Sequence, residues 1–183
     1  LRAKDFAFII EDSGCRSVIY SSEFADEVEA ALDQVATKPA HVSMVAGIGE
    51  SAKTASAELS VISATAMSEC FWLYSSGTTG EPKGVVHVHR DIVATCELYA
   101  VRVLGEIEDD IWFSVPKLFF AYGLGCGMTF PLWVGGSAVL DARRPTPETV
   151  TEIFRRFKPT VFAGVPTFYA AWLVDTDLKK EDV

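Results

Sequence analysis

Eleven consecutive residues near the middle of the chain combine five hydroxyl side chains, three glycines and one lysine. They read YSSGTTGEPKG and run from Tyr74 to Gly84. Glycine allows a backbone to bend and to approach a ligand closely. Hydroxyl and backbone N–H groups donate hydrogen bonds to phosphate oxygens, and a lysine adds a positive charge. A loop of this composition at the end of an apolar strand is therefore suited to bind a polyphosphate.

Two common phosphate-binding motifs do not describe this loop. The Walker A pattern GxxxxGK[ST] fails because the sixth position counted from Gly77 is Pro82, and counting from Gly80 gives no better match. The GxGxxG fingerprint of dinucleotide-binding proteins fails as well. Glycine-rich stretches also form mobile polar surface loops, so composition alone leaves phosphate binding and a plain surface loop as alternatives.

Short apolar strands alternate with helical patterns and must position this loop. The expected strands are rich in β-branched and aromatic residues and cover residues 16–21, 41–47, 70–76, 110–116, 135–141 and 159–166. The expected helices cover residues 24–36, 90–104, 146–157 and 167–173. Thr146 is the predicted N-cap of one of them, with Pro147 at its first position. The alternation predicts an α/β fold with a mainly parallel sheet flanked by helices.

Composition and charge narrow the range of functions. The chain of 183 residues is 49% hydrophobic and carries a formal net charge of −9. It is too apolar to be disordered, and an acidic chain has no broad attraction for nucleic acid or anionic membrane, so neither is an expected partner. The four cysteines form no CxxC pair, which argues against a disulfide framework and favours a cytoplasmic location.

Residues 119–140 carry no charge and are long enough to span a bilayer. They contain five glycines and one proline, so a buried helix followed by a buried strand is the preferred interpretation.

His87 and His89 are two residues apart, which places their side chains on opposite faces of an extended chain. Without a third ligand nearby they predict no metal site.

Residues 75–84 resemble, position by position, the loop signature of the adenylate-forming enzymes, [S/T]-[S/G]-G-[S/T]-[T/S]-G-x-P-K-G. The segments FWLYSSGTTGEPKGVVHVH, KLFFAYGLG and RPTPETV are similar to the benzoate-CoA ligase branch of this superfamily. The chain departs from most relatives at Phe120, where they carry a histidine. The resemblance extends over residues 1–183 and implies the central part of the large N-terminal AMP-binding domain, with the C-terminal domain outside the chain.

The resemblance implies a reaction in two steps. A carboxylate attacks the α-phosphate of Mg-ATP to give an acyl-adenylate and pyrophosphate, and the thiol of CoA then takes the acyl group and releases AMP. The implied cofactors are ATP, Mg²⁺ and CoA. The implied partners are a small aromatic carboxylic acid and the remainder of the same polypeptide.

The resemblance also assigns the site residues. The expected phosphate-binding residues are Ser76, Gly77, Thr78, Thr79, Gly80 and Lys83, with pinning of the loop by a carboxylate as the alternative role of the lysine. The expected acid-binding residues are Phe120, Ala121, Tyr122 and Gly123, for which plain core packing at a helix start is the alternative. Residues 164–167 resemble the segment that lines the acyl and pantetheine path, although a strand-to-helix turn explains them equally well.

No catalytic residue is expected within the chain. The family's magnesium-binding Thr-Glu pair, its ribose-binding aspartate and its adenylation lysine would all lie beyond Val183. We therefore expect residues 1–183 to be inactive by themselves. Two other functions stay open at this point: an adenylate-forming ligase for another carboxylic acid, and a truncated, non-catalytic nucleotide-binding module.

Overall fold

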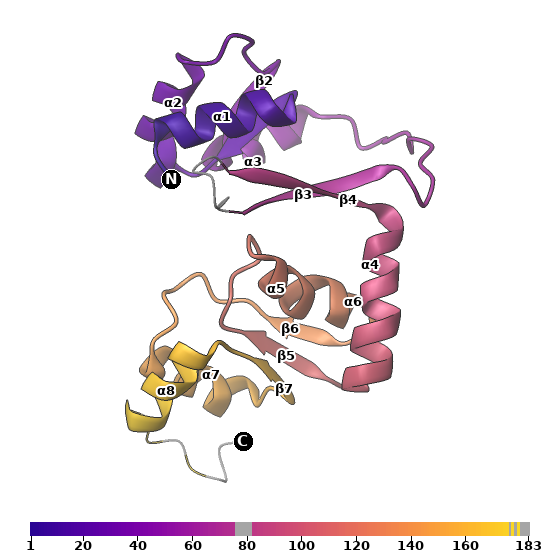
Figure 1. Cartoon of the computed structure of the whole chain (residues 1–183), viewed down its shortest axis with the longest axis vertical. Coiled ribbons are helices and arrows are strands. Elements are labelled where there is room, and N and C mark those ends of the chain that lie inside the picture. The colour runs from indigo at the N-terminus through magenta and orange to yellow at the C-terminus, as the bar shows by residue number, and fades with distance from the viewer. Residues whose placement is uncertain (76–81, 176, 178, 180–183) are drawn as a thin grey trace. The chain divides into compact units, whose positions relative to one another are not determined.

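The computed structural model describes residues 1–75, 82–175, 177 and 179. It confirms an α/β fold in which helices and strands alternate along the chain (Figure 1). The chain divides into two compact units. The first comprises Leu1–Ala64 and Tyr74–Val86, and the second comprises Thr65–Leu73 and His87–Val183.

The first unit is built around two parallel strands. Its elements are α1 (Ala3–Ser13), β1 (Ser17–Tyr20), η1 (Ser22–Phe24), α2 (Ala25–Leu32), β2 (His41–Met44) and α3 (Val45–Thr54). β1 pairs with β2 in parallel, and Ser17 lies opposite His41. The α1 and α2 helices lie side by side, and their core residues are Ala7, Ile10, Val28, Ala31, Leu32 and Val35 (Figure 1). An ion pair of 2.9 Å between Arg2 and Glu27 joins the two helices at the surface.

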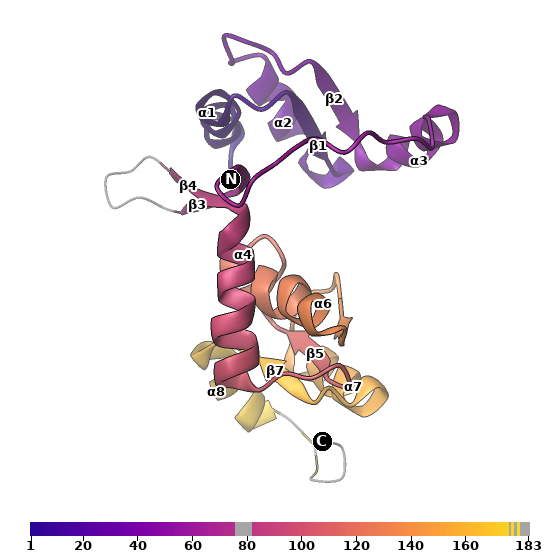
Figure 2. The ribbon, with the colours of Figure 1, turned by 90° about the vertical axis from the view of Figure 1, so that its right-hand side faces the viewer.

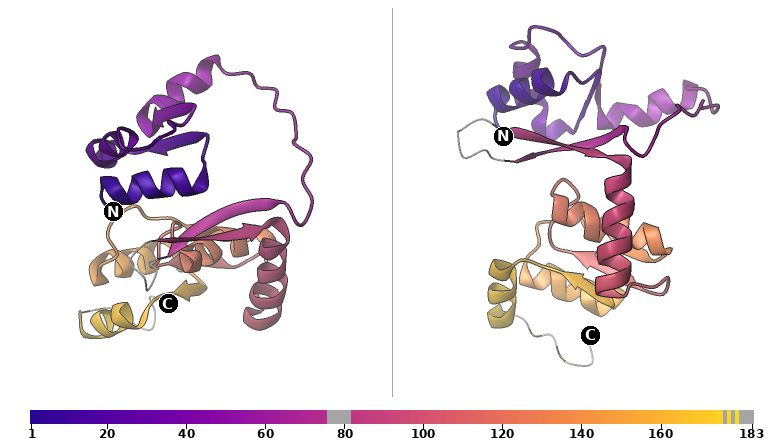
Figure 3. Two further views of the ribbon diagram at one scale, coloured as in Figure 1. Left: turned by 45° about the horizontal axis from the view of Figure 1, so that its top comes forward. Right: turned by 45° about the vertical axis from the view of Figure 1, so that its right-hand side comes forward.

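Strands β3 (Glu69–Ser75) and β4 (Lys83–Val88) form a separate two-stranded sheet (Figure 3). The boundary between the units crosses both strands. β3 agrees with the predicted strand 70–76, whereas β4 was not predicted. Its sequence KGVVHV opens with a charge and a glycine, which weakens the apolar pattern of a strand.

The second unit contains a three-stranded parallel sheet in the order β6-β5-β7. The strands are β5 (Ile111–Ser114), β6 (Ser137–Val139) and β7 (Val161–Ala163). Phe113 on the central strand lies opposite Val139 on one side and Phe162 on the other. Successive side chains of a strand point to opposite faces, and both Trp112 and Phe113 are at most 3% exposed. Both faces of this sheet are therefore covered.

Different helices cover the two faces. Trp112 belongs to a core cluster with Cys96, Ala100, Cys126, Phe130 and Ala163. These residues place η2 (Cys96–Leu104), a π-helix, with η3 (Gly125–Thr129) and α6 (Phe130–Val134) on one face. The preceding helix α4 (His89–Thr95) packs against the same cluster through the partly buried Ile92. Figure 2 shows α4 and η2 as one long helix. Phe113 belongs to a second cluster with Val150, Ile153, Phe154 and Phe168, which come from α7 (Pro147–Phe157) and α8 (Pro166–Asp175).

Two local predictions are confirmed in the second unit. The Oγ1 of Thr146 accepts a hydrogen bond of 3.3 Å from the backbone N–H of Thr149, and Pro147 is the first residue of α7. The uncharged segment 119–140 folds into short helices, beginning with α5 (Ala121–Leu124), and ends in β6. Within the described ranges the structure has no helix that is both long and apolar enough to cross a membrane.

Candidate functional site

The hydroxyl-rich loop connects two paired strands. β3 ends at Ser75 and β4 begins at Lys83. The predicted phosphate-binding residues between them, Ser76, Gly77, Thr78, Thr79 and Gly80, lie outside the described residues. Lys83 is exposed at the first position of β4. The structure thus describes the strand ends on either side of these residues, and their phosphate-binding role stays a prediction.

One hydroxyl of the stretch has a structural partner. The Tyr74 hydroxyl donates a hydrogen bond of 2.7 Å to the Oδ2 of Asp12 on α1. Burial, followed by the hydrogen bond to Asp12 and its negative charge, raises the pKa of Tyr74 to about 12. The phenol therefore remains a protonated donor over the physiological range and holds the end of β3 to α1.

The predicted acid-binding residues follow β5. Phe120 is exposed, and its ring centroid lies 4.5 Å from that of Phe119. Ala121 and Tyr122 open α5. The backbone N–H of Phe120 donates a hydrogen bond of 3.0 Å to the carbonyl of Lys117, so this short segment is folded back on the loop before it.

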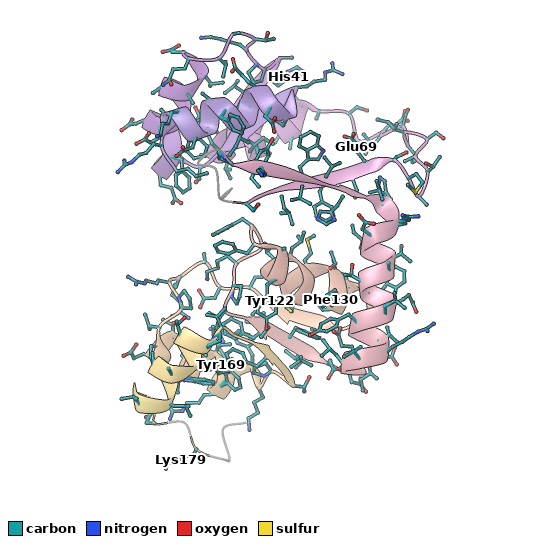
Figure 4. All side chains as sticks on the ribbon, viewed as in Figure 1. His41, Glu69, Tyr122, Phe130, Tyr169 and Lys179 are labelled. Carbon is teal, nitrogen blue, oxygen red and sulfur yellow. The ribbon has the colours of Figure 1, made fainter. Side chains whose placement is uncertain are left out.

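Tyr122 brings together two segments that are distant in sequence. Its hydroxyl donates a hydrogen bond of 3.4 Å to the carbonyl oxygen of Gly164, directly after β7. Burial, and then the nearby Cys126, Tyr169 and Tyr99, raise the pKa of Tyr122. A Cβ at Gly164 would lie 2.9 Å from the ring of Tyr169, so the glycine makes room for that ring. Tyr122 and Tyr169 are both labelled in Figure 4. Two segments singled out from the sequence therefore meet at the carboxyl edge of the sheet.

Close packing of the backbone explains why residue 123 is a glycine. It is buried, and a Cβ at this position would lie 2.0 Å from the carbonyl oxygen of Lys117 and 2.5 Å from that of Pro116. No side chain fits between the backbone of α5 and the preceding loop. This close approach accounts for the glycine without any ligand.

Ala121 borders a groove of about 470 Å³ that lies within the second unit. Its walls are mostly apolar and include Phe71, Leu73, Ile92, Leu98, Ala121, Leu124 and Phe130. Apolar concave sites with few polar groups are typical of binding sites for small organic molecules. The sequence did not reveal this groove, because its residues come from three separate stretches of the chain, 71–73, 87–99 and 121–130.

His87 forms part of the groove wall. Its ring stacks on Phe71 at 4.8 Å between centroids, and its Nδ1 lies 3.2 Å from the Oδ2 of Asp91. His89 opens α4 and is exposed, and His41 is the exposed first residue of β2. Among the residues that the structure describes, no three His, Cys, Asp or Glu side chains are grouped as metal ligands.

Comparison with known proteins gives the chain a family. The profile described as AMP-binding enzyme matches residues 1–183. Benzoate–CoA ligase of Thauera aromatica is 45% identical over 186 residues, which cover 99% of this chain and 35% of that enzyme. The 4-hydroxybenzoate–CoA/benzoate–CoA ligase of Rhodopseudomonas palustris is 39% identical over 192 residues, which cover 99% of this chain and 34% of that enzyme. The chain thus spans about a third of the length of these curated relatives.

Solved structures agree with the sequence relatives. A benzoate CoA ligase from Burkholderia xenovorans LB400 superposes with a TM-score of 0.88 at 38% identity, covering 100% of this chain and 37% of that one. The anthranilate CoA ligase AuaEII, solved with anthranoyl-AMP, superposes with a TM-score of 0.85 at 32% identity, covering 93% of this chain and 34% of that one. With its loop signature, its α/β fold and a family profile that matches every residue, this chain belongs to the AMP-binding enzyme family.

Proposed function

We propose that the protein carrying this chain is an ATP-dependent aryl-CoA ligase that converts a small aromatic carboxylic acid into its CoA thioester through an acyl-adenylate. The observation that supports this most strongly is 45% identity to a benzoate–CoA ligase over 99% of the chain, with the complete loop signature at residues 75–84. The chain is homologous to acid–thiol ligases. On the basis of this homology we propose the reaction, the class of acid and the roles of the residues.

The donor set of the loop fits the phosphates of ATP. Bound ATP supplies the phosphorus that the carboxylate attacks, with pyrophosphate as the leaving group. The hydroxyls of Ser76, Thr78 and Thr79 and the backbone N–H groups of Gly77 and Gly80 stabilise the charge that builds up on that leaving group. Lys83 adds a positive charge at the strand that follows the loop.

The acid is held by the segment after β5. Phe120 offers an exposed aromatic face, and Ala121 borders the apolar groove. Tyr122 is braced against the carbonyl of Gly164. Aromatic and small apolar side chains suit a flat ring, since they supply stacking surfaces and leave space for it. Gly123 contributes to this site by allowing α5 to lie close to the loop before it.

Magnesium and CoA are proposed cofactors. Because the resemblance assigns the magnesium-binding pair and the adenylation lysine to parts of the family's sequence that these residues do not match, residues 1–183 expressed alone are expected to show no acid activation.

The test is exchange of labelled pyrophosphate into ATP by the full-length gene product, with a panel of acids. The panel contains benzoate, hydroxybenzoates, anthranilate, a furan or thiophene carboxylate and a fatty acid. We expect the fastest exchange with a small aromatic acid, and formation of its CoA thioester when CoA is added. Exchange with the fatty acid alone would point to a ligase for another acid. Nucleotide binding without exchange for any acid would point to a non-catalytic binding module.

A further inference from the structure

Lys117 ties together two loops at the carboxyl edge of the central sheet of the second unit. It follows β5, and its ammonium group donates hydrogen bonds to the carbonyl oxygens of Asp141 and Arg143. The bond to the Arg143 carbonyl measures 2.7 Å. Both carbonyls belong to the loop after β6, the strand that pairs with β5. A single side chain therefore joins the loops of two neighbouring strands.

The backbone of Lys117 supports the proposed acid-binding segment directly. Its carbonyl oxygen accepts the hydrogen bond from the N–H of Phe120 at 3.0 Å. The same carbonyl lies against Gly123, where a Cβ would come within 2.0 Å of it. The position of Phe120, Ala121 and Tyr122 consequently depends on where the backbone of Lys117 is held.

The loop that receives Lys117 is itself fixed. The guanidinium of Arg143 donates to both carboxylate oxygens of Asp141: Nε lies 3.1 Å from Oδ1 and 2.9 Å from Oδ2, and Nη2 lies 2.7 Å from Oδ2. Its Nη1 donates a hydrogen bond of 2.8 Å to Glu152 on α7. Such a forked arrangement fixes orientation as well as distance. The hydrogen bonds from the side chain and backbone of Arg143 lower the pKa of Asp141, so its carboxylate stays charged. Lys117 is thus connected through this loop to α7.

The two loops also line a groove of about 450 Å³, whose walls include Lys117, Phe119, Leu140 and Asp141. The hydrogen bonds from Lys117 cross between the loops beside this groove. Hydrogen bonds from a charged donor are about twice as strong as neutral ones.

We propose that Lys117 is a positioning residue that sets the geometry of the acid-binding segment, and that affinity for the aromatic acid depends on its two hydrogen bonds. This inference rests on the proposed function, because it assigns the ring of the acid to residues 120–122. Lys117 acts through those residues and needs no contact with the acid.

The first test compares Lys117→Met with Lys117→Arg in the full-length protein, and uses Lys53→Met on the exposed α3 as the matched control. Methionine keeps most of the apolar stem and removes the donor. We expect Lys117→Met to raise the KM for the acid by about ten-fold while the KM for ATP stays unchanged. Lys117→Arg keeps a charged donor and should recover most of this loss. Lys53→Met should match the unchanged protein.

A second measurement tests this tether, the two hydrogen bonds from Lys117 to the loop after β6, without any substrate. Hydrogen exchange of the peptide covering residues 118–124 should be faster in Lys117→Met than in the unchanged protein, while peptides from α7 keep their rates. No acceleration would mean that the tether does not hold the segment, and would overturn the inference. So would a KM for the acid that stays within about two-fold, or KM values for acid and ATP that rise equally.

Failure of the proposed function would be seen in the unchanged protein, whereas failure of the inference about Lys117 would be seen only in Lys117→Met. If the unchanged protein shows no exchange with any acid, the proposed function fails, and the positioning role falls with it even if hydrogen exchange reveals the tether. If the unchanged protein is active and Lys117→Met binds the acid normally, only the inference about Lys117 is overturned.

Discussion

The Tyr122 hydroxyl donates a hydrogen bond of 3.4 Å to the Gly164 carbonyl. Tyr122 lies in α5, in the segment that follows β5, and Gly164 directly follows β7. Loops at the carboxyl ends of parallel strands meet at one edge of a sheet, where α/β proteins bind their ligands. The bond joins two segments that the sequence linked to the same acid only through a resemblance.

Tyr122 is expected to contribute to acid binding through its ring more than through its hydroxyl. In the full-length enzyme, Tyr122→Ala should raise the KM for the acid clearly more than the KM for ATP, because the aromatic wall is lost. Tyr122→Phe keeps the ring and loses one long hydrogen bond, so its effect should be smaller. Steady-state kinetics with both substrates varied provides the measurement. Equal changes in both KM values after Tyr122→Ala would argue against a pocket wall.

Thr79 is expected to act on the reaction and not on folding. Removing one hydrogen bond to a charged group costs about 1.5–3 kcal/mol, so Thr79→Ala should slow acid-dependent pyrophosphate exchange by about ten-fold or more. The midpoint of urea unfolding should not change. Thr54→Ala, at the exposed end of α3, is the control for loss of a threonine hydroxyl. An unchanged exchange rate and ATP affinity in Thr79→Ala would remove this residue from the phosphate site.

Gly123 should tolerate no side chain. Gly123→Ala forces a Cβ against the carbonyls of Lys117 and Pro116, so the free energy of unfolding should fall by about 1–3 kcal/mol. Gly49→Ala is the matched control, because Gly49 lies inside α3 with open space around its Cα. There alanine should raise the free energy of unfolding by about 0.5–1 kcal/mol. Urea unfolding of both variants measures these changes in the free energy of unfolding. A Gly123→Ala variant as stable as the unchanged protein would contradict the close approach of α5 to the preceding loop.

Glu106 should make the protein less stable as the pH rises. It is 5% exposed, and within the described part of the chain neither carboxylate oxygen has a hydrogen-bond partner. Burial, and then the charge of Asp110, raise its pKa from 4.5 to about 7. The folded state therefore keeps a proton that the unfolded chain releases. The free energy of unfolding should fall between pH 4.5 and 7, by up to about 3 kcal/mol, and level off above that range.

The measurement for Glu106 is urea unfolding at pH 5 and pH 8. Glu106→Gln removes the titration and should flatten the difference between the two values. Glu108→Gln changes an exposed neighbour and should keep the slope of the unchanged protein. A slope that persists in Glu106→Gln would assign the pH dependence to other groups.

The sequence was sufficient for those features that depend on neighbouring residues. Periodic apolar positions predicted α2, α7, α8 and the long helix of α4 and η2, and Thr146 with Pro147 predicted the start of α7. Most strands were also predicted, but the expected strand 41–47 was wrong in its last three residues, because β2 ends at Met44 and α3 begins at Val45. The loop signature predicted the family, because ten consecutive positions carry its donors and glycines. β4 was missed because its apolar pattern is weak, and it becomes a strand by pairing with β3.

Features that join distant segments required the tertiary structure. The bond from Tyr122 to Gly164, the tether from Lys117 to the loop after β6, and the burial of Glu106 each depend on how segments pack. The same carboxyl group of Glu106 would be an ordinary surface acid in an exposed turn, and Lys117 reads in sequence as a single charge before an apolar run. Local patterns determine which elements form, whereas close packing around the central sheet determines which side chains meet.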